Sequence, residues 1–114
     1  MAHTIDILFF DGCPHVERAR RVVRLAIAWA GVAEPVAIRE IRVADDGEAR
    51  SRRFLGSPTV RVDDCDVDAT GGRRDDFGIQ CRIYETDGRL VPAPPVEWIV
   101  AALCRQVVRS CARP

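Results

Sequence analysis

Cys13 is the residue whose type and place in this sequence most favour reactive chemistry. It follows a β-branched and aromatic stretch over 4–10, and Pro14 and a helical pattern of apolar residues come directly after it. A cysteine at a helix N-terminus faces unpaired N–H groups and the positive end of the helix dipole, and both favour the thiolate over the thiol. The thiolate is the form that attacks a disulfide or binds a soft metal. We therefore predict that Cys13 is a nucleophilic thiolate.

Cys81 is the best candidate for a second thiol. Its position relative to Cys13 depends on which strand pairs with the third strand, expected over 59–62. An antiparallel strand over 65–67 would return the chain toward the sheet edge where Cys13 lies, so that Cys81 could approach it. If a strand over 79–85 pairs with the third strand instead, Cys81 would lie near the beginning of that strand, at the opposite edge of the sheet. A disulfide needs Cα atoms within about 7 Å of each other, and the sequence leaves both arrangements open.

The other three cysteines are expected to have structural roles. The total of five is odd, so internal pairing cannot include every cysteine, and in a reducing compartment free, catalytic or metal-binding thiols are more common than disulfides. Cys65 would face the core or solvent from a short strand. Cys104 and Cys111 share one stripe of the last helix, where small hydrophobic residues often pack. Two turns apart, they cannot be bridged to each other within that helix.

The elements that hold these thiols follow from periodicity and turn residues. We expect strands over 4–10, 35–43, 59–62, 65–67 and 79–85, and helices over 14–30, 46–54 and 95–110. Gly31 is the expected end of the first helix, Asp45 the N-cap of the second and Gly56 its end. Asp63-Asp64 and Asp87-Gly88 are expected turns. Strands separated by helices imply parallel pairing through right-handed crossovers, and hence an α/β domain.

Length and composition narrow the classes of protein further. With 114 residues, 47% of them hydrophobic, the chain suits a single domain over 1–114 with one compact core. Charged residues make up 30% and the formal net charge is zero, which argues against binding to nucleic acid or to a membrane surface. All 17 basic residues are arginine, so Schiff-base chemistry is excluded. No run approaches the roughly 20 apolar residues of a membrane span, and we expect a cytoplasmic protein.

Two segments resemble the thioredoxin-fold superfamily. These are the Gly-Cys-Pro turn at 12–14, directly after the first strand, and Gly-Ser-Pro-Thr at 56–59, directly before the third. The chain is further similar to small bacterial thioredoxin-like proteins that also carry a Cys-Arg-x-Tyr segment, here 81–84, and some of which are labelled alkylmercury-lyase-like. The resemblance covers nearly the whole chain and implies a three-layer sandwich with a central mixed four-stranded sheet flanked by helices. Val16 stands where dithiol thioredoxins have their second cysteine, so local Cys-x-x-Cys chemistry is absent.

The same resemblance implies which residues surround the thiol. In the superfamily the proline before the third strand follows a cis peptide bond and faces the active-site cysteine, whereas the alternative is an ordinary trans proline. If it is cis, the backbone of the preceding serine can pair with an extended peptide or a thiol ligand. The histidine after the turn either tunes the thiolate or is a first-turn residue without a role. Candidate catalytic residues are Cys13 and Cys81, and candidate substrate-binding residues are Pro14, His15, Ser57, Pro58 and Thr59.

Three functions remain open at this point. In a thiol-disulfide oxidoreductase, Cys13 attacks a disulfide, and Cys81 or an external thiol resolves the mixed disulfide. In a soft-metal or organomercurial-handling module, two thiolates would bind mercury or copper. A thioredoxin-fold domain that only binds a partner is the third possibility. We expect no cofactor, no resident metal, and a thiol or disulfide substrate that is either a protein or a low-molecular-weight compound; neither nucleic acid nor membrane is an expected partner, and the oligomeric state is open.

Overall fold

A computed structural model of the chain describes residues 2–104. Its elements are, in chain order, β1 (His3–Phe9), α1 (Val16–Ala30), β2 (Val36–Arg42), α2 (Asp46–Ser51), β3 (Thr59–Val62), β4 (Cys65–Asp66), the 3-10 helix η1 (Gly71–Arg73), β5 (Tyr84–Thr86), β6 (Arg89–Val91) and α3 (Val96–Cys104). The expected continuation of the last helix to residue 110, and Cys111, lie outside the described residues.

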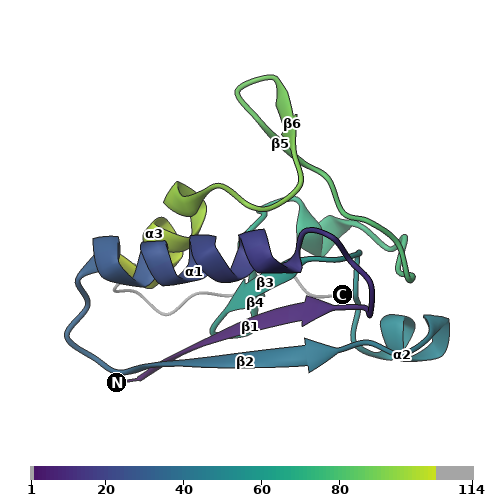
Figure 1. Cartoon of the computed structure of the whole chain (residues 1–114), viewed down its shortest axis with the longest axis horizontal. Helices are drawn as coiled ribbons and strands as arrows, with labels where there is room; N and C mark the ends of the chain where they lie inside the picture. Colours follow the sequence, from purple (N-terminus) through teal and green to yellow (C-terminus); the bar gives the residue numbers. More distant parts are fainter. Residues whose placement is uncertain (1, 105–114) are drawn as a thin grey trace.

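The central sheet has four strands in the order β2-β1-β3-β4 (Figure 1). β1 pairs with β2 in parallel, whereas the β1–β3 and β3–β4 pairs are antiparallel. The prediction of an α/β fold with a mixed four-stranded sheet is confirmed. Of the two candidates for the strand beside β3, the short one at Cys65–Asp66 is the one that forms.

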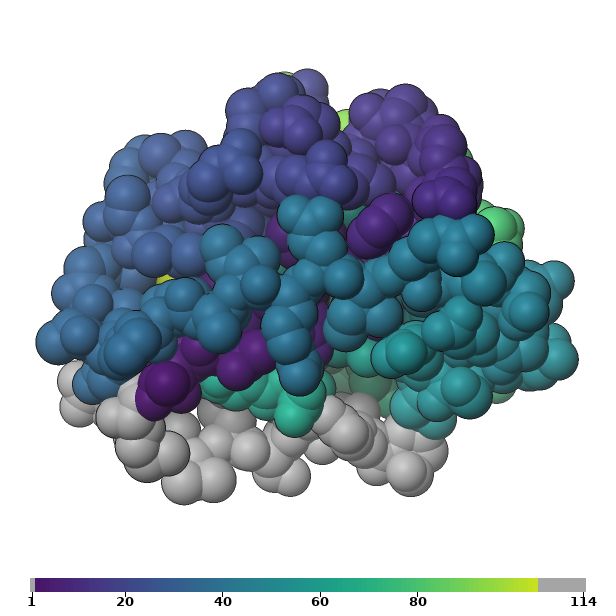
Figure 2. Space-filling model, turned by 60° about the horizontal axis from the view of Figure 1, so that its bottom comes forward, coloured from purple at the N-terminus to yellow at the C-terminus, as the bar shows by residue number. Residues whose placement is uncertain are grey.

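Helices cover the two faces of this sheet to different extents. α1 and α3 pack together on one face, where Ile5 and Ile7 of β1 meet the inward residues of both helices. On the other face Leu8 packs with Val43, Ala49 and Phe54, so that α2 covers only the end of the sheet at which β1 finishes (Figure 1). Figure 2 shows β2 lying across the middle of this side with the α2 region at one end.

The first helix begins later than its sequence pattern predicts. Its first internal hydrogen bond runs from the N–H of Ala19 to the carbonyl of His15, so the helix begins at Val16 and not at Pro14. The preceding residues form a turn instead, in which Gly12 has a φ of +88° and Cys13 donates its N–H to the carbonyl of Phe10 at 3.3 Å. The predicted end is confirmed, since Gly31 is the left-handed C-cap. Cys13 therefore lies in the turn ahead of the helix, not in its first turn.

Asp45 caps α2 as predicted, because its side chain accepts a hydrogen bond from the N–H of Glu48 at 2.8 Å. Glu48 reaches back to accept from the N–H of Ala44, and this bond, together with Arg52, lowers the pKa of Glu48. The helix ends at Ser51, earlier than expected. Arg53 takes up a left-handed conformation with a φ of 56°, which turns the chain before Gly56 is reached and directs Phe54 into the core.

We expect Asp45→Ala to lower the free energy of unfolding by about 1 kcal/mol, because the N–H of Glu48 would lose its acceptor. Urea denaturation measures this change. Asp45→Asn is the control, since it keeps a side-chain acceptor at the cap and should stay within about 0.5 kcal/mol of the parent. Equal destabilisation by the two substitutions would contradict the role of the side-chain bond.

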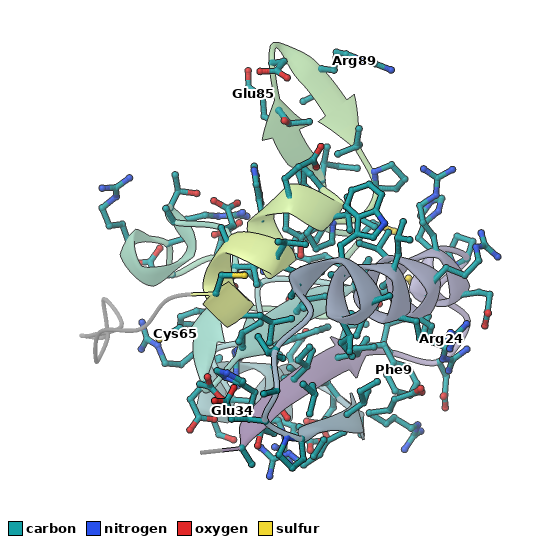
Figure 3. All side chains as sticks on the ribbon, turned by 90° about the vertical axis from the view of Figure 1, so that its left-hand side faces the viewer. Phe9, Arg24, Glu34, Cys65, Glu85 and Arg89 are labelled. Atoms are coloured by element: carbon teal, nitrogen blue, oxygen red, sulfur yellow. The ribbon has the colours of Figure 1, made fainter. Side chains whose placement is uncertain are left out.

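The segment over 79–85 does not form one strand of the central sheet. Only its end belongs to a strand, β5, which pairs with β6 in a separate two-stranded sheet through the expected Asp87-Gly88 turn. Both turn residues have positive φ, 52° and 74°. The hairpin projects from the body of the molecule, with Glu85 and Arg89 on its outer part (Figures 1 and 3).

Candidate functional site

Cys13 is a half-buried free thiol in the turn between β1 and α1. Beside it Pro14 is exposed and His15, the N-cap of α1, is half-buried, so both predicted site residues lie at the surface of the turn. Val16, at the position where a local second cysteine would stand, is buried in the core. This turn therefore presents one thiol, and a second one has to come from elsewhere in the chain.

The Ser57–Pro58 peptide bond is cis, as the resemblance implies. The register of β1 with β3 pairs Leu8 with Thr59, and the two strands are antiparallel. The chain that leaves β1 toward Cys13 therefore starts at the same end of the sheet as residues 57–58. Ser57, Pro58 and Thr59 are all buried, so these predicted substrate-binding residues lie beneath the surface at that end of the sheet.

Cys81 reaches this same end of the sheet through a parallel bridge to Ser57. The N–H of Ser57 donates to the carbonyl of Gln80 at 2.8 Å, and the N–H of Arg82 donates to the carbonyl of Ser57 at 3.0 Å. Cys81, between these two bonds, is exposed and is a free thiol. The backbone of Ser57, which we expected to be open to a ligand, is thus paired with the protein's own chain.

A buried arginine, to which the sequence pattern assigns no role, holds this bridge in place. The Arg82 side chain is fully buried, and its guanidinium donates to Asp66 at 2.7 and 3.1 Å and to the hydroxyl of Thr59 at 3.1 Å. Asp68 lies 3.6 Å from the same group. The sequence does carry one signal for the burial of Arg82, since in an extended chain Arg82 faces the side opposite to the exposed Cys81 and Ile83. Charged residues are seldom fully buried unless paired, however, and the pairing carboxylates are remote in sequence.

Tyr84 completes the buried network next to the cis peptide bond. Its hydroxyl donates to the carbonyl of Pro58, and its ring lies 4.6 Å from the guanidinium carbon of Arg82 and edge-on to Trp98. Burial raises the pKa of Tyr84 well above its ordinary value, although the charge of Arg82 acts in the opposite direction. The phenol therefore stays protonated and keeps its hydrogen bond at every pH at which the protein is expected to work.

The remaining described cysteines take no part in this site. Cys65 is buried, which is one of the two placements expected for it, and it is disulfide-bonded, so the general preference for free thiols does not hold at this position. Cys104 is free but exposed at the end of α3 and does not fill the core. Across residues 2–104, no three or more His, Cys, Asp or Glu side chains come together as a group able to hold a metal ion. Within the same residues, no helix has the length and apolar character needed to cross a membrane.

No protein-family model, no curated protein and no solved structure matches this chain. Its function therefore has to be inferred from the geometry of the site and from the chemistry of its thiols.

Proposed function

We propose that the chain is a thioredoxin-like thiol-disulfide exchange protein in which Cys13 is the nucleophile and Cys81 the second thiol. The observation that carries the proposal is the bridge between Cys81 and Ser57, the residue before the cis proline. It brings an exposed free thiol from a distant part of the sequence to the end of the sheet where the Cys13 turn begins. A second thiol from a distant segment would take the role of the local second cysteine, whose position is occupied by Val16.

Three features support a thioredoxin-like topology for the domain. The sheet order is β2-β1-β3-β4, with β1 and β2 parallel and β3 and β4 antiparallel. The first helix follows β1 after the short turn that contains Cys13, and the proline before β3 follows a cis peptide bond. These three features are the support for the thioredoxin-like arrangement that we propose.

The proposed exchange has two steps. The Cys13 thiolate attacks one sulfur of a substrate disulfide, a Cys13–substrate disulfide forms, and the other substrate sulfur leaves as a thiolate that takes a proton from water. The Cys81 thiolate then attacks the sulfur of Cys13, forms the Cys13–Cys81 disulfide and releases the second substrate thiol. The substrate gains two electrons and the protein dithiol loses them. A low-molecular-weight thiol would reduce the protein again for the next turnover.

We expect Cys81→Ser to leave the first step nearly unchanged and to stop the second. Reduced protein mixed with glutathione disulfide should then accumulate a stable Cys13–glutathione disulfide, which intact-mass spectrometry detects, whereas the parent protein should lose it rapidly. Cys104→Ser is the matched control, because Cys104 is also a free and exposed thiol. If the Cys81→Ser and Cys104→Ser variants lose the mixed disulfide at the same rate, Cys81 is not the resolving thiol.

A further inference from the structure

We propose that residues 78–84, here called the covering segment, prevent extended polypeptides from pairing with the backbone of Ser57. Cys13 therefore reacts with compact, low-molecular-weight disulfides. The inference rests on the proposed function of Cys13 and names the substrate class of that site. It comes from the hydrogen bonds that join the covering segment to residues 54–59.

The covering segment uses the backbone groups that a bound peptide would need. An extended ligand pairs with a chain through free N–H and carbonyl groups along its edge. At Ser57 both groups are engaged, the N–H with the carbonyl of Gln80 and the carbonyl with the N–H of Arg82. A peptide can pair with Ser57 only after the covering segment has left.

The two segments are joined along their whole length. The N–H of Gly78 donates to the carbonyl of Phe54 at 3.1 Å, and the side chain of Gln80 donates to the carbonyl of Leu55 at 3.1 Å. Further along, the buried Arg82 bonds to Thr59, and Tyr84 donates to the carbonyl of the cis proline. Side-chain and backbone bonds therefore flank the Ser57 bridge on both sides and hold the covering segment against residues 54–59.

Gly56 shows how closely the covering segment approaches. A Cβ atom on residue 56 would lie 2.9 Å from the carbonyl oxygen of Gln80 and 3.1 Å from the Cβ of Arg82, and the φ of Gly56 is +127°. Only glycine combines this conformation with this contact. No side chain could be added between the two segments, so a peptide strand has no room there either.

Cys13 and Cys81 remain accessible to a small disulfide while the covering segment is in place, since Cys13 is half-buried and Cys81 is exposed. A compact disulfide needs access only to the sulfur atoms, whereas an extended polypeptide also needs a strand edge to pair with. The covering segment leaves the first requirement met and removes the second at Ser57. We therefore assign the site to disulfides of small thiols.

The experiment compares two substrates with the same leaving group. One is the mixed disulfide of cysteine with glutathione, and the other is an extended decapeptide that carries one glutathionylated cysteine. Reduced protein that carries Cys81→Ser, the parent protein of this experiment, reacts with each in a single turnover. Glutathione is then released only when Cys13 attacks the other sulfur of the disulfide, and the rate constant for this release is measured. We expect the small disulfide to react at least about tenfold faster, a factor that corresponds to about 1.4 kcal/mol.

Loosening the covering segment should shrink this preference. Gln80→Ala removes the side-chain bonds to Leu55 and Asp76, and Tyr84→Phe removes the bond to Pro58. In these variants the ratio of the two rate constants should fall toward one, while Asp75→Ala, an exposed position in the preceding loop, should keep the parental ratio. Circular dichroism verifies that each variant is folded.

The outcomes separate this inference from the proposed function. Equal rates for the two substrates in the parent protein would overturn the inference and leave the thiol function intact. A ratio that stays at the parental value in both loosened variants would overturn the inference in the same way. If neither substrate reacts at Cys13, the proposed function fails and the substrate class fails with it.

Discussion

Cys13→Ser is expected to slow the reaction of the reduced protein with glutathione disulfide by at least about tenfold, because the nucleophile is removed and only the slower attack by the exposed Cys81 thiol is left. A serine hydroxyl does not ionise near neutral pH, so the variant has no anion at this position to attack the disulfide. Mixed-disulfide formation, followed by mass spectrometry in a Cys104→Ser background, measures the loss. That background removes an exposed thiol that could react independently of the site.

The matched comparison for this prediction is Cys81→Ser in the same background. It should retain the rate of the first attack, since the second thiol acts only after the mixed disulfide has formed. A Cys13→Ser variant that still reacts within about threefold of the parent would show that another thiol is the nucleophile.

The second large effect is expected at Asp66, which pairs with the buried Arg82. Asp66→Asn keeps the shape of the side chain but removes its charge, so the fully buried guanidinium is left with the more distant Asp68 as an anionic neighbour. Removing one partner of a buried ion pair typically costs about 3–5 kcal/mol, and we expect a loss near the lower limit. Chemical denaturation of the parent and the variant measures the difference in the free energy of unfolding.

The exposed pair between Arg42 and Asp11 supplies the control. Its N–O distance of 2.6 Å is as short as that of the buried pair, but the two side chains are 57% and 68% exposed. Asp11→Asn should therefore change the free energy of unfolding by no more than about 0.5 kcal/mol. Similar losses in Asp11→Asn and Asp66→Asn would mean that burial does not set the strength of the Arg82 pair.

Arg82→Met tests the same pair from the other side. Methionine fills much of the volume of the arginine and carries no charge, and Asp66 and Asp68 retain some exposure to solvent, 15% and 13%. We expect this variant to be less destabilised than Asp66→Asn, because a partly exposed carboxylate can be hydrated whereas a buried guanidinium cannot.

Features specified by neighbouring residues can be predicted from the sequence. Gly31 ends α1 and Asp45 caps α2, because a left-handed C-cap and a side-chain acceptor each need only local residue types. The Asp63-Asp64 turn is of the same kind, with both residues at positive φ, 51° and 69°. The sequence pattern places the start of α1 too early because Pro14 suits both a first helical turn and the tight turn that follows β1.

Features that depend on distant contacts cannot be predicted in the same way. The choice between 65–67 and 79–85 as the fourth strand is decided by the pairing of β3 with β4 and by the bridge from Cys81 to Ser57. The burial of Arg82 depends on Asp66, which lies 16 residues away, and no local pattern specifies that pairing. For the candidate site, the sequence singles out the two thiols but not the segment that covers Ser57.

The proposed partnership of Cys13 and Cys81 is tested most directly by mapping the disulfide that forms on oxidation. The reduced Cys104→Ser protein is treated with one equivalent of glutathione disulfide, alkylated, digested and analysed by mass spectrometry. Apart from the disulfide of Cys65, which re-forms on oxidation, we predict a peptide pair linked through Cys13 and Cys81 as the main product, at a rate independent of protein concentration. A stable Cys13–glutathione disulfide with Cys81 still alkylated would contradict the proposal.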